Sequence, residues 1–164
     1  MGQIGEILID SLEFARERRR LAGKLPVNSM SRLADILADD RGSLSWVVSG
    51  ECDADHKPLL VIEVAGELHL RCQRCLGALA HDLKIMSRLQ LVPRGAVWPD
   101  EDLEDDRVDP IEAADDQRVL TLVEDEVLLA LPIAPRHQSC MMPGYADGSE
   151  VASPFAALAK LKKH

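Results

Sequence analysis

The sequence predicts an α+β fold: an antiparallel sheet with a C-x-x-C knuckle between two long strands, and helices at the N-terminus, after an acidic loop and at the C-terminus. Two observations predict it. From about residue 43 to residue 91, apolar and polar residues alternate, which is the period of strands. On either side of this region, apolar residues recur every three or four positions, which is the period of helices.

Length and composition indicate a globular protein. The chain has 164 residues, of which 46% are hydrophobic and 29% are charged. It has no apolar run near 18 residues, so we expect no membrane-spanning segment. The first residues lack the order of a signal peptide, so we expect a cytoplasmic location. We expect residues 1–142 to form a single α+β domain, followed by a linker and an amphipathic helix in residues 143–164.

The N-terminal region predicts a strand and two helices. Glu6–Asp10 is short and rich in β-formers. Ser11 can cap a helix that continues through Leu21, and Gly23 would end it. A second helix is expected from Met30 to Leu37, before the alternating region begins.

The alternating region predicts two long neighbouring strands. Even-numbered apolar residues mark one face of the first strand, and odd-numbered ones mark one face of the second. These residues are Leu60, Ile62, Val64, Leu68, Leu70 and Cys72, then Leu79, Leu83, Ile85, Leu89 and Leu91. Cys72 and Cys75 therefore lie in the connection between two strands that we expect to be antiparallel.

The second half of the chain predicts an acidic loop, an edge strand and two helices. Residues 93–106 are dense in acidic residues, Pro and Gly. Val108–Glu112 contains a proline, which edge strands tolerate. A helix is expected from Asp115 or Asp116 to Leu131, and a last amphipathic helix from Ser153 to Lys163.

The central helix carries three consecutive carboxylates, from Glu124 to Glu126. Consecutive residues on a helix diverge by about 100°, so these groups cannot converge on one ion. Glu124 falls at the edge of the apolar stripe, where we expect it to be half-buried and paired with an arginine. We interpret the group as structural or as a contact with a partner.

Charge limits the classes of partner. The net charge of −9 argues against a simple nucleic-acid binder, whose surface should be basic. Basic residues cluster between Arg16 and Lys24 and again at the C-terminus, while acidic residues concentrate between Asp100 and Glu126. The chain could therefore contact a basic protein with one region and RNA with another.

The cysteines predict a candidate zinc site. Cys72 and Cys75 are spaced as one edge of a zinc tetrahedron, and His137 and Cys140 have the same spacing. Together they form a Cys3His set, in which Cys52 could substitute for one ligand. Two alternatives remain: four reduced thiols without a metal, or a redox pair at Cys72 and Cys75.

Three arginines flank the two halves of this set: Arg71, Arg74 and Arg136. If the halves meet, these guanidinium groups form a local basic surface suited to a phosphate group or to a carboxylate of a partner. The alternative is that they are ordinary surface arginines, or that one of them pairs with Glu124.

Three segments resemble the YceD family, the bacterial large ribosomal RNA subunit accumulation proteins. They are ELHLRCQRC (residues 67–75), VEDEVLLALPIAP (residues 123–135), which precedes His137 and Cys140, and SPFAALAKLKK (residues 153–163). The resemblance implies a cytoplasmic protein needed for synthesis, processing or stability of 23S rRNA. It implies no known active site.

We therefore expect a non-catalytic factor in large-subunit biogenesis that binds ribosomal RNA, pre-50S components or a basic ribosomal protein. The alternative is a thiol-disulfide or zinc-dependent enzyme that uses Cys72 and Cys75. A nuclease is disfavoured, because the sequence shows no converging carboxylates and no set of His and Lys residues suited to that chemistry.

Overall fold

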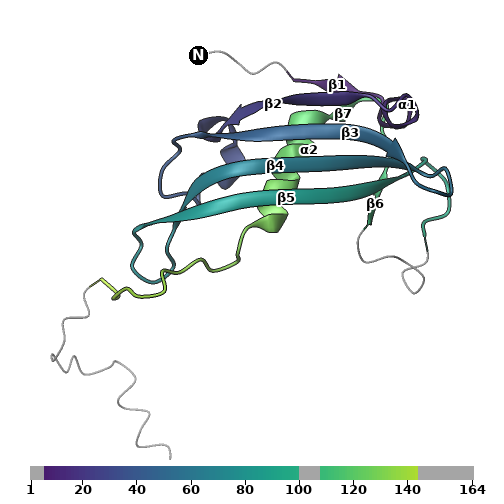
Figure 1. Ribbon diagram of the computed structural model, residues 1–164. Coiled ribbons are helices and arrows are strands. Elements are labelled where there is room, and N and C mark those ends of the chain that lie inside the picture. The colour runs from purple at the N-terminus through teal and green to yellow at the C-terminus, as the bar shows by residue number, and fades with distance from the viewer. Residues whose placement is uncertain (1–5, 100–107, 144–164) are drawn as a thin grey trace, which may run out of the picture.

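A computed structural model of the chain describes residues 6–99 and 108–143 and confirms an α+β fold (Figure 1). A five-stranded sheet has the strand order β2-β3-β4-β5-β6, and β1 pairs with β7 in a separate two-stranded sheet. The strands are β1 (Leu8–Ile9), β2 (Arg20–Pro26), β3 (Ser43–Cys52), β4 (Pro58–Arg71), β5 (Ala78–Val92), β6 (Asp109–Glu112) and β7 (Gln117–Arg118). The helices are α1 (Ser11–Arg16) and α2 (Val119–Ala130), with 3-10 turns η1 (Val27–Ser29) and η2 (Ser31–Leu33).

The β4–β5 hairpin dominates the sheet. Its antiparallel register runs unbroken from the pair Leu59 and Gln90 to the pair Arg71 and Ala78. The predicted alternation is confirmed, since the even-numbered apolar residues from Leu60 to Cys72 are buried. The hairpin therefore carries the turn at residues 72–77 to one end of the molecule.

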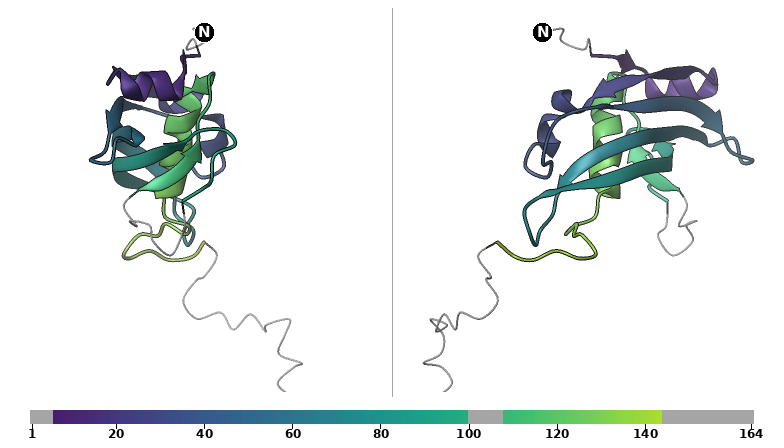
Figure 2. Two further views of the ribbon diagram at one scale, coloured as in Figure 1. Left: turned by 90° about the vertical axis from the view of Figure 1, so that its right-hand side faces the viewer. Right: turned by 60° about the vertical axis from the view of Figure 1, so that its left-hand side comes forward.

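Helix α2 packs along one face of this curved sheet (Figure 2). Val119, Val123 and Val127 are fully buried against the core residues of β3, β4 and β5. Leu129, on the other side of the helix, is exposed. The segment that follows α2 leaves the sheet at the end where β4 turns into β5, so two distant parts of the chain come together there.

The predicted N-terminal helix ends earlier than expected. It ends at Arg16 rather than after Leu21, and Arg18 adopts a left-handed conformation with a φ of 52°. The chain then forms β2, which pairs with β3 along its whole length. Gly23 is therefore not a helix terminator; it lies beneath the indole ring of Trp46, which takes the space of a side chain.

The predicted second helix is wrong. Met30, Leu33 and Leu37 are buried as their helical spacing suggested, but the backbone forms the 3-10 turns η1 and η2. Tertiary contacts compete with the helix here, because the carbonyl of Ile36 accepts a hydrogen bond from the backbone N–H of Arg71 at 2.8 Å.

The region after the acidic loop also differs from the prediction. Strand β6 forms at Asp109–Glu112 as an edge strand, but it pairs with β5 in parallel, so the sheet is mixed. The helix predicted from Asp115 or Asp116 begins at Val119, because Gln117 and Arg118 pair with β1 instead. The predicted C-terminal helix lies outside the described residues, and the boundary between residues 142 and 143 stays a prediction.

His69 on β4 lies between two carboxylates. Its Nδ1 is 3.0 Å from Oδ1 of Asp39, and its Nε2 is 3.2 Å from Oε1 of Glu67. The hydrogen bond with Asp39 raises the pKa of His69 above its ordinary value. The stabilisation is therefore fully present below the unfolded-state pKa, near pH 6.5, and is lost as the pH rises through the raised pKa of the folded state.

Replacing His69 with glutamine should therefore destabilise the protein more in acid than in base. We expect the loss in free energy of unfolding to be larger near pH 5.5 than near pH 8, although solvent screening keeps the difference small for this partly exposed pair. Urea denaturation at both pH values measures it. His81→Gln is the control, since His81 has no carboxylate partner among the described residues. Equal losses at the two pH values would contradict the prediction.

Candidate metal centre

The turn between β4 and β5 holds two thiols in a closed loop of hydrogen bonds. The backbone N–H of Cys72 donates to the carbonyl of Gly77, and that of Leu76 donates to the carbonyl of Cys72, both at 2.9 Å. Leu76 has a φ of 62°, a left-handed conformation that lets the chain reverse within this short loop. The loop brings the Sγ atoms of Cys72 and Cys75 within 4.8 Å of each other.

The segment after α2 closes over this turn. Leu131 is buried, and Pro132 cannot continue the helix. The carbonyl of Pro135 accepts a hydrogen bond from the backbone N–H of Gln73 at 2.8 Å. This contact aligns the two segments, so that His137 and Cys140 meet Cys72 and Cys75.

The four side chains converge on one point, and we call them the Cys3His cluster. One ligand atom from each of Cys72, Cys75, His137 and Cys140 lies within 4.8 Å of the other three. Ligands in a zinc tetrahedron with Zn–S distances near 2.3 Å lie about 3.8 Å apart. The Sγ atoms of Cys72 and Cys140 are 3.8 Å apart, and Sγ of Cys75 is 3.3 Å from Nδ1 of His137. The cluster can therefore hold a tetrahedral metal ion.

The ring of His137 is oriented for this role. Its Nε2 lies 3.0 Å from the carbonyl oxygen of Ala78 at the start of β5. Because a carbonyl only accepts, Nε2 carries the hydrogen, and the lone pair of Nδ1 points toward the thiols. Metal-binding histidines are commonly held in this way by a carbonyl or carboxylate on the opposite nitrogen. Nothing in the sequence pattern marks the Ala78 carbonyl, so sequence reasoning missed it.

The environment favours a thiolate at Cys72. Hydrogen bonds from backbone N–H groups, chiefly that of Cys75, lower the pKa of the Cys72 thiol to about 5. One such group is the N–H of Arg74, 3.4 Å from Sγ of Cys72. Burial raises the pKa of Cys140. A divalent cation would compensate the cost of ionising that half-buried thiol, because metals bind the thiolate form.

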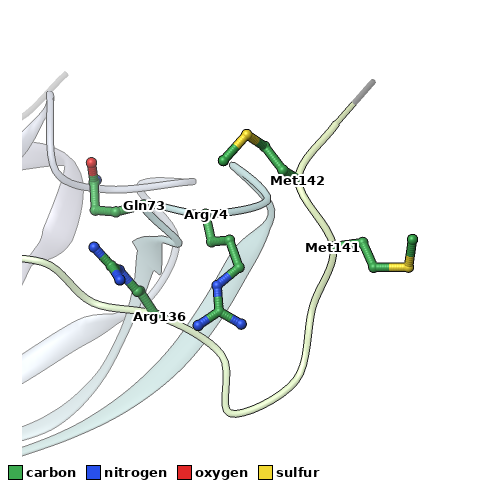
Figure 3. Close-up of a pocket in the computed structure, with 5 residues that line it drawn as sticks. All are labelled: Gln73, Arg74, Arg136, Met141 and Met142. Carbon is green, nitrogen blue, oxygen red and sulfur yellow. The ribbon is translucent and has the colours of Figure 1, made fainter. Parts of the chain in front are cut away.

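The predicted binding residues separate into two groups. Arg74 and Arg136 line an open hollow of about 540 Å³ beside the cluster, together with Gln73, Met141 and Met142 (Figure 3). Sequence reasoning did not identify Gln73 and the two methionines, which have no distinctive spacing.

The remaining predicted residues lie elsewhere. The guanidinium of Arg71 donates to the carbonyl of Leu37 at 3.3 Å and does not line the hollow. Glu124 is half-buried, but it accepts a hydrogen bond from the backbone N–H of Arg32 at 3.1 Å rather than pairing with an arginine side chain. Cys52 pairs with Pro58 at the opposite end of β4 from the turn, so it cannot substitute as a ligand.

Comparison with known proteins decides the family. A family model described as the large ribosomal RNA subunit accumulation protein YceD matches residues 60–162. The chain belongs to the YceD family. The YceD match covers β4 from Leu60 onward, β5 and α2, and all four residues of the Cys3His cluster fall inside it.

A curated YceD relative extends the likeness to the N-terminal elements. The large ribosomal RNA subunit accumulation protein YceD of Haemophilus influenzae is 29% identical over 175 residues, which cover 96% of this chain and 95% of that protein. No solved structure matches this chain. Within residues 6–99 and 108–143, no helix is both long and apolar enough to cross a membrane.

Proposed function

We propose that this chain supports the accumulation of large-subunit ribosomal RNA in the cytoplasm by binding ribosomal RNA or components of the pre-50S particle, without catalysis of its own. One observation carries this proposal: the chain belongs to the YceD family, and a relative of that name aligns with 96% of its length. An involvement in large-subunit accumulation is what that name states.

We also propose that the Cys3His cluster holds Zn²⁺ as a structural ion. Thiolates and an imidazole are the donors that zinc prefers, and two pairs of donor atoms here lie 3.8 Å and 3.3 Å apart, near the edge length of a zinc tetrahedron. Four protein ligands complete the tetrahedron and leave no position for water or substrate, whereas a catalytic zinc keeps one position open. This arrangement supports a binding role rather than an enzymatic one.

The lowered pKa of Cys72 favours a second candidate, thiol–disulfide exchange. In that reaction Cys72 and Cys75 would become a disulfide while a substrate disulfide is reduced to two thiols. Two features argue against it. The Cys72 side chain is fully buried, and the pair joins two strands instead of opening a helix. Reduction of a disulfide substrate at a rate that depends on Cys72 would establish this candidate instead.

Depletion in the native host tests the proposed function. We expect the ratio of 23S to 16S rRNA to fall and free 50S subunits to decrease on sucrose gradients, with recovery when the chain is supplied from a plasmid. The tagged chain should sediment with pre-50S particles. An unchanged 23S to 16S ratio after complete depletion would refute the proposal, as would a chain that sediments only as free protein.

A further inference from the structure

The hollow beside the Cys3His cluster is a basic surface on an acidic protein. Its walls are the turn at residues 72–77 and the segment at residues 131–143, and neither contains an aspartate or a glutamate. The whole chain has 28 acidic residues against 19 basic ones. The two walls nevertheless contribute Arg74 and Arg136 to the same hollow.

Most of the donor groups of these arginines are available to a ligand. Each guanidinium has five N–H donors. Arg74 uses one of them for the carbonyl of Cys140, at 3.4 Å. Among the described residues, no carboxylate pairs with either arginine, and no hydrogen bond involves the Arg136 guanidinium. In Figure 3 the Arg74 side chain extends from the turn toward the segment at residues 131–143, and the Arg136 side chain extends from that segment toward Gln73.

The described acidic residues of β6 lie far from this hollow. Asp109 and Glu112 pair with Leu89 and Val92, at the opposite end of β5 from the turn. Since β5 has 15 residues at about 3.3 Å each, its ends are roughly 45–50 Å apart. The Debye length at physiological salt is about 8 Å, so these charges are screened at the hollow.

A metal ion in the cluster would organise the hollow through geometry rather than through charge. Three thiolates and Zn²⁺ carry a formal charge of −1, which two arginines exceed. The segment at residues 131–143, which carries His137 and Cys140, also positions the arginines directly. Arg136 immediately precedes His137, and Arg74 contacts the carbonyl of Cys140. If the segment at residues 131–143 were released from the turn, the contact of Arg74 with Cys140 would be lost, and Arg136 would no longer be held beside Arg74.

We propose that this hollow binds a backbone phosphate of RNA between Arg74 and Arg136, and that metal binding at the Cys3His cluster assembles it. The proposal rests on the proposed function, which makes RNA the expected source of the anion. Guanidinium groups recognise phosphate oxygens through paired, charge-assisted hydrogen bonds. Gln73 supplies a further polar group, and the exposed Met142 offers an apolar rim for a sugar or base.

The test is filter binding of the full chain, loaded with zinc, to 23S rRNA transcribed in vitro. For Arg74→Ala with Arg136→Ala, we expect about tenfold or greater loss of affinity near 0.15 M salt. The slope of log K against log salt should fall by about 0.7, since a single-strand phosphate contact contributes about 0.7 and the hollow holds one phosphate. The control is Lys24→Ala with Lys84→Ala, which removes the same charge from exposed strand positions and should leave the slope unchanged.

The contribution of the metal is tested in the same assay. Cys140→Ser, which retains both arginines, should lose metal and bind RNA as weakly as the double arginine variant. Wild-type protein stripped of metal should regain affinity when zinc is added back. RNA affinity that is unchanged by stripping would overturn the assembly role of the metal.

Two further outcomes would overturn the phosphate site itself. One is an equal loss of affinity in the lysine control, which would show that only net charge matters. The other is a glutamate-rich peptide that competes at equal charge and binds more tightly than RNA, which would assign the hollow to an acidic protein. If either occurs while depletion still lowers the ratio of 23S to 16S rRNA, the phosphate site is wrong and the proposed function stands.

Discussion

Replacing Cys75 with serine is expected to abolish metal binding and release the segment after α2, while the sheet stays folded. Zinc content should fall from about one ion per chain to under about 0.1, because three remaining ligands hold the ion poorly. The amide of Gln73, which donates to the carbonyl of Pro135, should lose its protection from hydrogen exchange. Metal analysis of gently purified protein and hydrogen exchange measure the two effects.

The core of the molecule explains why the effect is local. The cluster lies at the end of the β4–β5 hairpin, whereas the buried residues of β3, β4, β5 and α2 form a continuous core without it. Cys52→Ser is the matched control, because Cys52 is a free thiol remote from the turn. Metal-free wild-type protein with full protection at Gln73 would refute a structural metal ion.

Replacing Gly50 with alanine is expected to destabilise the folded protein strongly, although it adds only one methyl group. Gly50 on β3 approaches α1 so closely that an added Cβ would lie 2.3 Å from the carbonyl oxygen of Phe14 and 2.6 Å from Cα of Ala15. Both neighbours are backbone atoms of buried residues, so no side chain can rotate away. We expect a loss of about 2–4 kcal/mol in free energy of unfolding, measured by urea denaturation.

Two hydrogen bonds hold the backbone after α1 against β3 at this contact. The backbone N–H of Gly50 donates to the carbonyl of Arg19 at 2.8 Å, and the N–H of Arg19 donates to the carbonyl of Phe14 at 3.1 Å. Moving α1 to accommodate a methyl group would strain both. Ser49→Ala, at the residue that precedes Gly50 on the same strand, adds no atom and should change stability by under about 0.5 kcal/mol. A Gly50→Ala variant as stable as this control would contradict the close approach.

Local patterns predicted the part of the fold that depends on local pairing. The alternation from Leu60 to Leu91 identified the β4–β5 hairpin, because its register follows from a short turn between consecutive strands. The matching spacings of Cys72 with Cys75 and of His137 with Cys140 predicted which residues would meet. The alternation and the two spacings each lie within a short stretch of sequence, so they can be recognised without the structure.

Non-local pairing decided the elements that were not predicted. The first helix was predicted to run through Leu21 and to end at Gly23, but the backbone of residues 20–26 pairs with β3, which begins 17 residues after Pro26. Strand β6 joins β5 in parallel, an arrangement that no turn between them specifies. The Ala78 carbonyl and the hollow at Gln73 likewise depend on where the segment after α2 lies. Tertiary contacts overrode local propensity in each case.

The closure of the segment after α2 onto the turn also ties the helix to the hairpin by a second route. Helix α2 already packs on the sheet, and the carbonyl of Pro135 adds a hydrogen bond from the backbone N–H of Gln73 at the end of the hairpin. An ion at the cluster would therefore act as a cross-link between Cys72 and Cys140, which closes a long loop of the chain and favours the folded state over the unfolded one.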